Sequence, residues 1–117
     1  MAERNMDMKK CPMPVQDPDV RNKNFDEVAL GYTYDMAVNE ARRCLNCPKK
    51  PCQSACPVQI DIPAFIERVA NEDMDGAFEI LSKSTSLPAV CGRVCPQENQ
   101  CEGKCVRGIK GEAVGIG

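Results

Sequence analysis

Apolar residues recur at helical spacing in the middle of the chain. After Asp61, apolar side chains occupy the positions of one buried helical stripe, namely Ile62, Phe65, Ile66, Val69 and Ala70. The same spacing returns at Met74, Ala77, Phe78 and Leu81. The two stripes predict a helical hairpin, with Asp61 as the cap of its first helix. We expect Phe65 and Phe78 to be among its largest core residues, as packing side chains.

Before this hairpin, a capping signal predicts a short helix. Asn24 and Glu27 have the spacing of a capping box, in which each side chain satisfies a backbone N–H of the first turn. Gly31 then supplies a stop for the helix. The pattern therefore predicts a helix over residues 25–30.

Two further N-cap residues predict helices that end at or near cysteines. Thr33 is placed to cap a helix that runs to Arg43 and presents Cys44 at its end. Ser86 is placed to cap a short helix over residues 88–91. No stretch alternates apolar and polar residues over a useful length, so the predicted fold class is all-α, with short helices and cysteine-bearing loops.

The two ends of the chain lack these patterns. Residues 1–23 are polar and contain closely spaced prolines, which predicts an irregular N-terminal arm. Residues 24–107 are expected to form the folded unit, and residues 108–117 the start of a linker. Gly115–Gly117 resembles the opening of a dinucleotide-binding motif, but the strand, third glycine and following helix of that motif are missing.

Composition narrows the classes of function. The chain has 117 residues, of which 4% are aromatic, so large apolar side chains are few and a covalent or metal staple is expected. Histidine is absent, which excludes zinc fingers with histidine ligands, Rieske clusters and catalytic dyads that need an imidazole. A net charge of −2 disfavours nucleic acid as a partner. No secretory leader or membrane-spanning stretch is recognisable, so we expect a cytoplasmic location away from the membrane.

Eight of the nine cysteines fall into two runs, each containing a Cys-x3-Cys-Pro segment. The first run is Cys44, Cys47, Cys52 and Cys56, and the second is Cys91, Cys95, Cys101 and Cys105. Thiolates at this density select iron–sulfur clusters, zinc or copper(I). Iron–sulfur clusters are favoured over a structural zinc module, because only Cys44 and Cys47 have the spacing of a zinc knuckle, and over disulfides, because the expected compartment is reducing.

In two-cluster ferredoxins, the cysteine before the proline of such a run binds the other cluster. By this logic Cys44, Cys47 and Cys52 hold one [4Fe–4S] cluster, and Cys56 crosses to a second. The second run mirrors the first, so that Cys95 and Cys101 join Cys56 while Cys105 returns to the first cluster. Pro48 and Pro51 are expected to keep Cys47 and Cys52 on a non-helical loop. Cys11 lies far from the runs and is expected to bind no metal.

Basic residues surround the first cysteine run, at Arg42, Arg43, Lys49 and Lys50. They could offset the negative charge of thiolate-bound clusters or dock an acidic partner. They could equally be the solvated end of a helix.

The segments from Arg43 to Val58 and from Leu87 to Cys105 resemble the N-terminal iron–sulfur domain of the small (beta) subunit of NADPH-dependent glutamate synthase. The same domain begins dihydropyrimidine dehydrogenase and the larger subunit of an NADH-dependent ferredoxin:NADP oxidoreductase. The resemblance covers roughly residues 24–117, and both spacing and intervening residues agree. It implies an α-helical ferredoxin-like domain with two [4Fe–4S] clusters.

The resemblance also implies a ligand set. The first cluster would take Cys44, Cys47, Cys52 and Cys105. The second would take Cys56, Cys95 and Cys101, with a Gln or Glu side chain a few positions beyond Gly117 as its fourth ligand. Within this chain the second cluster would then lack its fourth ligand, take Cys91 or Glu112 in its place, or be absent. Cys91 matches a family position that is not a ligand and ranks below the seven other cysteines.

The implied role is electron transfer. In such glutamate synthases, FAD in the small subunit takes hydride from NADPH, and the clusters carry single electrons towards FMN in the large subunit. FAD and NADPH would bind in a region that this chain does not contain, and the chain alone would lack a complete active site. The alternative parent is another flavin-dependent NAD(P)H oxidoreductase that shares the domain.

Overall fold

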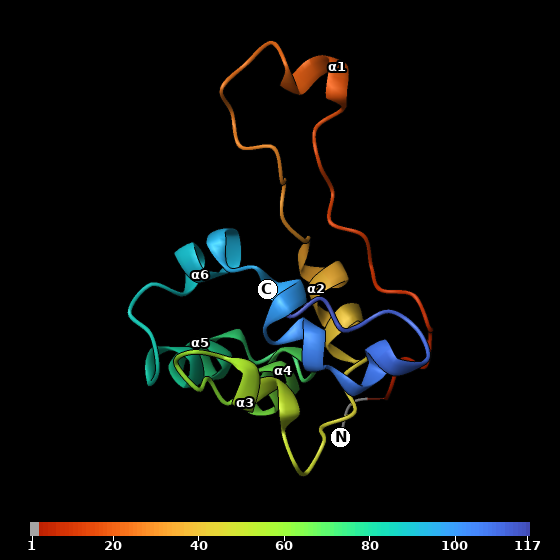
Figure 1. Cartoon of the computed structure of the whole chain (residues 1–117), viewed down its shortest axis with the longest axis vertical. Coiled ribbons are helices and arrows are strands. Elements are labelled where there is room, and N and C mark those ends of the chain that lie inside the picture. The colour runs from red at the N-terminus through yellow and green to blue at the C-terminus, as the bar shows by residue number, and fades with distance from the viewer. Residues whose placement is uncertain (1–2) are drawn as a thin grey trace.

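The computed structural model describes residues 3–117, and this part of the chain is helical, as the sequence predicts (Figure 1). Its α-helices are α1 (Pro18–Arg21), α2 (Tyr34–Ala41), α3 (Pro51–Ala55), α4 (Ile62–Ala70), α5 (Met74–Ser82) and α6 (Pro88–Val94). Three 3-10 helices follow, η1 (Gln97–Asn99), η2 (Glu102–Lys104) and η3 (Val106–Ile109). None of the helices between residues 3 and 117 has the length and apolar character to cross a bilayer.

The predicted hairpin is formed by α4 and α5, which pack against each other. Asp61 caps α4, because its carboxylate accepts a hydrogen bond from the Ala64 N–H at 3.4 Å. Asp73 caps α5 in the same way, through the Gly76 N–H at 2.9 Å. Both helices therefore begin where a carboxylate satisfies a free N–H of the first turn.

One expected core residue of the hairpin lies outside the core. Phe65 packs against the buried cluster, but Phe78 is 58% exposed, so the prediction for Phe78 was wrong. Helix α5 packs mainly on α4 and turns Ala77, which is 4% exposed, towards it. A helix with one main neighbour buries a narrow stripe, and Phe78 falls outside that stripe.

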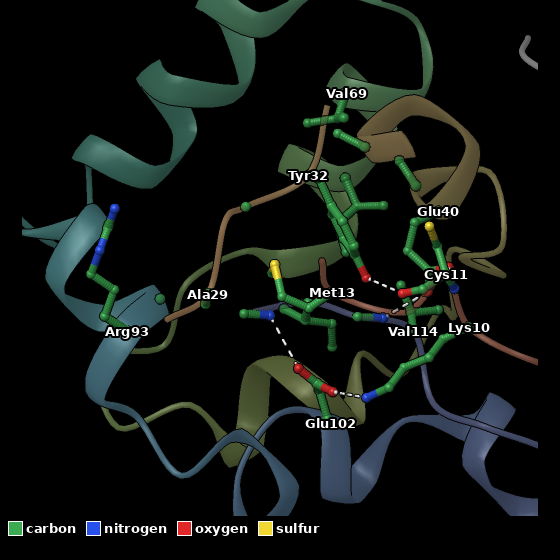
Figure 2. A pocket seen from close by; sticks show the side chains of 18 of the residues that line it. Lys10, Cys11, Met13, Ala29, Tyr32, Glu40, Val69, Arg93, Glu102 and Val114 are labelled. Carbon is green, nitrogen blue, oxygen red and sulfur yellow. Dashed lines mark hydrogen bonds and ion pairs between the residues drawn. The ribbon is translucent and has the colours of Figure 1, made fainter. Parts of the chain in front are cut away.

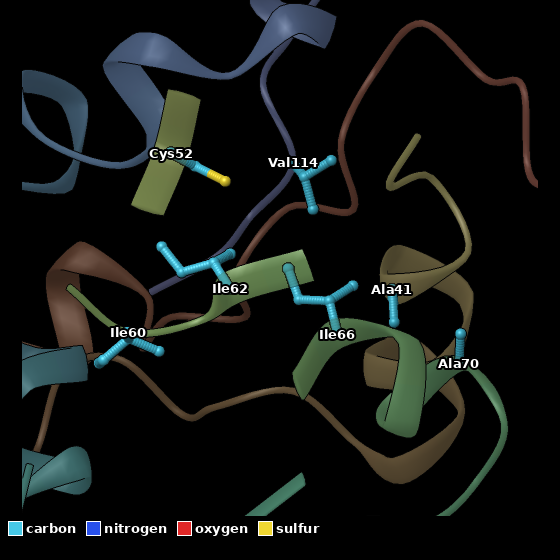
Figure 3. Packing of buried hydrophobic residues seen from close by; sticks show 7 residues of the cluster. All are labelled: Ala41, Cys52, Ile60, Ile62, Ile66, Ala70 and Val114. Carbon is cyan, nitrogen blue, oxygen red and sulfur yellow. The ribbon is translucent and has the colours of Figure 1, made fainter. Parts of the chain in front are cut away.

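The core joins α2, α4 and the C-terminal segment (Figure 3). Its buried members are Ala41, Cys52, Ile60, Ile62, Ile66, Ala70 and Val114. Burial of an isoleucine side chain contributes about 1.5–3 kcal/mol, so Ile62 and Ile66 are major contributors, at 2% and 4% exposed. Val114 brings residues far from the hairpin in sequence onto the same core.

Helix α1 lies near the tip of a projection whose two legs are the segments on either side of the helix (Figure 1). The legs are joined by backbone hydrogen bonds, including Gln16 N–H to Val28 O at 2.9 Å, and by one isolated antiparallel bridge. The predicted helix over residues 25–30 was wrong. The Asn24 side chain accepts from the Asp26 N–H at 2.9 Å and closes a turn there instead of capping a helix.

Two cysteine-bearing segments also differ from the prediction. Cys52 lies in helix α3, not on a loop, because Pro51 occupies the first helical position, where a missing N–H costs nothing. Helix α6 extends to Val94 and its N-cap is Leu87, not Ser86. The Thr85 hydroxyl accepts the Leu87 N–H at 3.1 Å at this point of the chain.

Candidate metal centre

A first cavity is lined by four cysteine side chains from both runs. They are Cys44, Cys47, Cys52 and Cys105. The remaining walls are mostly apolar, from residues such as Ile62, Ile66 and Val114. Helix α3 packs against η2, and this contact draws the second run towards the first.

A second cavity is lined by the other four clustered cysteines, Cys56, Cys91, Cys95 and Cys101. Cys56 is the C-cap of α3 and Cys95 is the C-cap of α6, so the chain turns sharply at both residues. Gln97 and Gln100 are polar side chains on the same cavity wall. The cavity encloses about 210 Å³.

The two cavities are neighbours, because Ile62 and Ile116 line both. Sulfur donors in an apolar surround are the ligand chemistry of iron–sulfur clusters, and the donor sets fit that group. Between residues 3 and 117 no three His, Cys, Asp or Glu side chains converge on the position of a single metal ion. The first cavity is the smaller of the two, at about 20 Å³.

The loop of the first run uses left-handed backbone at two non-glycine residues. Asn46 has φ 52° and Lys50 has φ 45°. Asparagine tolerates this conformation, whereas lysine adopts it at a cost. The Lys50 ammonium lies 2.9 Å from both carboxylate oxygens of Asp61, which ties the loop to the N-terminus of α4.

Backbone N–H groups point at two sulfurs of the first cavity. The Asn46 N–H donates to Cys44 Sγ at 3.4 Å, and the Val114 N–H donates to Cys105 Sγ at 3.5 Å. Hydrogen bonds to ligand sulfurs stabilise negative charge on them. The first site therefore carries preformed donors for thiolate sulfur.

Burial raises the pKa of several of these thiols. The pKa of Cys52 and that of Cys101 are each raised to about 11, mainly by loss of hydration. Smaller contributions come from neighbouring groups: Cys44 and Cys105 act on Cys52, whereas Glu102 and then Cys56 act on Cys101. The thiols among these neighbours fall into the same two groups as the cavity linings.

Other sequence candidates lie elsewhere. Cys11 lines a different, larger cavity and touches neither cysteine group. Glu112 lines neither cysteine cavity, and its carboxylate accepts the Lys10 N–H at 2.8 Å. Of the two alternatives within the chain for a fourth ligand of the second cluster, only Cys91 reaches the cavity.

The basic residues near the first run do not form one exposed patch. Arg43 is 1% exposed and pairs with Glu40 at 2.7 Å, so the idea that it docks a partner or sits in solvent was wrong. Glu40 itself is 2% exposed and was not singled out in the sequence. The spacing of the two residues, three apart on a predicted helix, was the available signal.

Comparison with known proteins agrees with this site. A family model described as dihydropyrimidine dehydrogenase domain II, 4Fe-4S cluster, matches residues 21–117. This match identifies an iron–sulfur domain of a kind that oxidoreductases contain. The chain belongs to this dihydropyrimidine dehydrogenase domain II family.

The relatives of the chain include subunits of two kinds of oxidoreductase. The chain is 38% identical over its whole length to the glutamate synthase (NADPH) small chain of Halomonas elongata, covering 26% of that protein. It is 43% identical over 71% of its length to the NAD-dependent dihydropyrimidine dehydrogenase subunit PreT of Salmonella typhimurium, covering 20% of it. It is 39% identical over 80% of its length to PreT of Escherichia coli, covering 23% of it. The chain thus spans about a quarter or less of these relatives.

Proposed function

We propose that this chain binds two [4Fe–4S] clusters and serves as the electron-transfer domain of a larger oxidoreductase. The first cluster is held by the thiolates of Cys44, Cys47, Cys52 and Cys105. The second is held by those of Cys56, Cys95 and Cys101. The observation that carries the proposal is the partition of the clustered cysteines into two adjacent cavities with a shared apolar wall.

Bound clusters of this kind accept and release single electrons. The chain's own residues supply sulfur ligands, keep water away with apolar side chains, and place the two sites next to each other across Ile62 and Ile116. Cys52 and Cys101 have raised thiol pKa values, so binding of the clusters must release protons from these groups.

The fourth ligand of the second cluster is proposed to be a Gln or Glu side chain from sequence that follows Gly117 in the family. Cys91 lines the cavity and is the candidate within the chain. Replacing Cys91 with alanine decides between the two candidates. If the ligand is the Gln or Glu side chain, the iron content is unchanged. If the ligand is Cys91, about half of the iron is lost.

For the whole protein we propose an NADPH-dependent glutamate synthase, with the clusters passing electrons between FAD of the small subunit and FMN of a large subunit, in the cytoplasm. A relative with the glutamate synthase small-chain name matches the full length of this chain and supports this parent. PreT relatives support the alternative, another flavin-dependent NAD(P)H oxidoreductase. Two assays of the whole protein, each with NADPH and with NADH, separate these parents. A glutamate synthase forms glutamate from 2-oxoglutarate and glutamine, whereas a dihydropyrimidine dehydrogenase reduces a pyrimidine.

The cluster proposal is tested on anaerobically prepared protein. We expect a brown protein with iron and acid-labile sulfide in equal amounts, roughly eight of each per chain for two four-iron clusters. Cys52→Ala and Cys101→Ala should each remove about half of the iron, because each touches one cavity. Cys11→Ala is the matched control and should keep all of it. A colourless protein with stoichiometric zinc would instead establish a structural zinc module.

A further inference from the structure

A buried ion pair joins α2 to both ends of the chain. The Glu40 carboxylate and the Arg43 guanidinium lie 2.7 Å apart, and the two side chains are 2% and 1% exposed. A buried pair is tolerable only when its remaining donors and acceptors are also satisfied. Here these partners come from two backbone segments, residues 7–11 and residues 112–115.

The guanidinium of Arg43 binds four backbone carbonyl oxygens. On the C-terminal side, its N–H groups donate to the Glu112 carbonyl at 2.6 Å and to the Ala113 carbonyl at 3.2 Å. On the N-terminal side they donate to the Asp7 carbonyl at 3.0 Å and the Met8 carbonyl at 3.3 Å. The rigid fork of arginine, which lysine lacks, holds these segments together.

The carboxylate of Glu40 completes the arrangement with two backbone N–H groups. One oxygen accepts the Gly115 N–H at 2.8 Å, and the other accepts the Cys11 N–H at 2.8 Å. Figure 2 shows Glu40 beside Cys11, whose carbonyl accepts the Tyr32 hydroxyl at 2.6 Å. Residues 112, 113 and 115 are therefore each bonded to the pair.

The residue enclosed by these bonds is Val114. Its side chain is 2% exposed in the core, and its N–H donates to Cys105 Sγ at 3.5 Å. The direction of that N–H is set by the peptide between Ala113 and Val114, and the carbonyl of this same peptide accepts from Arg43. The buried pair thus fixes the peptide that reaches the sulfur of the first site.

We propose that Glu40 and Arg43 are positioning residues for the first cluster: they hold residues 112–115 so that the Val114 N–H donates to the Cys105 thiolate and raises the cluster's reduction potential. The inference rests on the proposed function. A reduced cluster carries one more negative charge, and a fixed N–H donor on a ligand sulfur stabilises that charge. Loss of the donor lowers the potential.

The test compares reduction potentials in loaded proteins. Arg43→Lys keeps the charge but loses the fork, and Glu40→Gln keeps one acceptor oxygen but loses the charge. Val114→Pro removes the N–H donor itself. Arg42→Lys is the control, since the Arg42 side chain makes none of these bonds within residues 3–117.

In an anaerobic titration followed by electron paramagnetic resonance, we expect one cluster of the first three variants to be reduced at lower potential, with unchanged iron content. The second cluster is the internal reference and should keep its potential, as should both clusters of the control. Full iron content with both potentials unchanged in Arg43→Lys and Val114→Pro would overturn the inference. Unsubstituted protein without clusters would instead refute the proposed function.

A second measurement needs no substitution. In unsubstituted loaded protein moved into D₂O, pulsed electron paramagnetic resonance should detect a proton coupled to the first cluster that exchanges slowly, because the Val114 N–H is buried and bonded. Absence of such a proton in protein with both clusters would contradict the proposal, whatever the stability of the variants.

Discussion

At the scale of single residues, burial decides which side chains matter, and it separates residues that look alike in the sequence. Arg42 and Arg43 are adjacent, yet only Arg43 is buried at 1% exposure and paired with Glu40. Ile62 and Phe78 are both apolar members of the helical hairpin, yet one is 2% exposed and the other 58%. The expected effect of a substitution therefore depends more on the contacts of the residue than on its type.

Replacement of Ile62 by alanine should destabilise the protein strongly. The side chain is buried between the core and both cysteine cavities, and a cavity of this kind costs about 2–5 kcal/mol. Phe78→Ala is the contrasting variant and should cost markedly less, because Phe78 is mostly exposed. Denaturant unfolding of the two variants measures which of them loses more free energy of unfolding. A larger loss for Phe78→Ala would contradict the packing described here.

Tyr32 should ionise only at high pH. Burial, and next the negative charge of Glu40, raise the pKa of Tyr32 to about 12 from 10.0. The protonated phenol is favoured by folding, so its contribution is complete below pH 10 and is lost as pH rises towards 12. Ultraviolet titration of tyrosinate should show a late step that Tyr32→Phe removes.

The same variant loses the hydrogen bond from the Tyr32 hydroxyl to the Cys11 carbonyl. At neutral pH this should lower the free energy of unfolding by about 1 kcal/mol. If Tyr32→Phe instead kept the step near pH 12 at its full amplitude, the burial of Tyr32 would be refuted.

At the scale of elements, carboxylates and prolines begin several of the helices, and two of the clustered cysteines lie at helix ends. Asp61 is the clearest case, since it caps α4 and also binds Lys50 in the loop of the first run. Cys56 and Cys95 are C-caps of α3 and α6. Helix ends therefore set the directions from which thiols enter the two cavities.

The two roles of Asp61 can be separated by substitution. Asp61→Ala should cost about 0.5–2 kcal/mol, because it removes the N-cap of α4. Asp61→Asn keeps a capping oxygen and loses only the exposed ion pair with Lys50, so it should cost about 1 kcal/mol or less. Thermal unfolding of both variants measures the difference. Equal losses would show that the cap contributes nothing.

The sequence predicted the elements whose signals are local. The helices α4 and α5 and the cap at Asp61 need only neighbouring residues, and all three were predicted correctly, although Phe78 lies outside the buried stripe of α5. The helix over residues 25–30 failed because Asn24 bonds within a turn and to the opposite leg of the arm, where its amide donates to the Gln16 side chain at 2.9 Å. That partner is set by tertiary structure, which the capping pattern does not contain.

At the scale of the whole molecule, segments from the N-terminal and C-terminal parts of the chain meet at the buried Glu40–Arg43 pair. Residues 112–115 cross the centre of the fold, where Arg43 binds the Glu112 and Ala113 carbonyls. Val114 packs in the core (Figure 3) and lines the first cysteine cavity. The expectation that residues 108–117 only begin a linker remains a prediction about domain boundaries, but it gave no hint of this packing.

The assignment of cysteines to two groups is the part of the site that sequence could anticipate. The rule for ferredoxin-type runs sends Cys56 and Cys105 to opposite groups, and the cavities contain them in that arrangement. The buried Glu40–Arg43 pair could not be read as part of the site, because charge alone does not reveal burial. The ligand assignment itself stays a proposal until clusters are observed.

The most direct measurement is the location of iron in a crystal of the anaerobically loaded protein by anomalous scattering at the iron edge. Two compact iron peaks are predicted, one bounded by the sulfurs of Cys44, Cys47, Cys52 and Cys105 and the other by those of Cys56, Cys95 and Cys101. A single peak, or iron bound with Cys105 on the side of Cys56, would contradict the account.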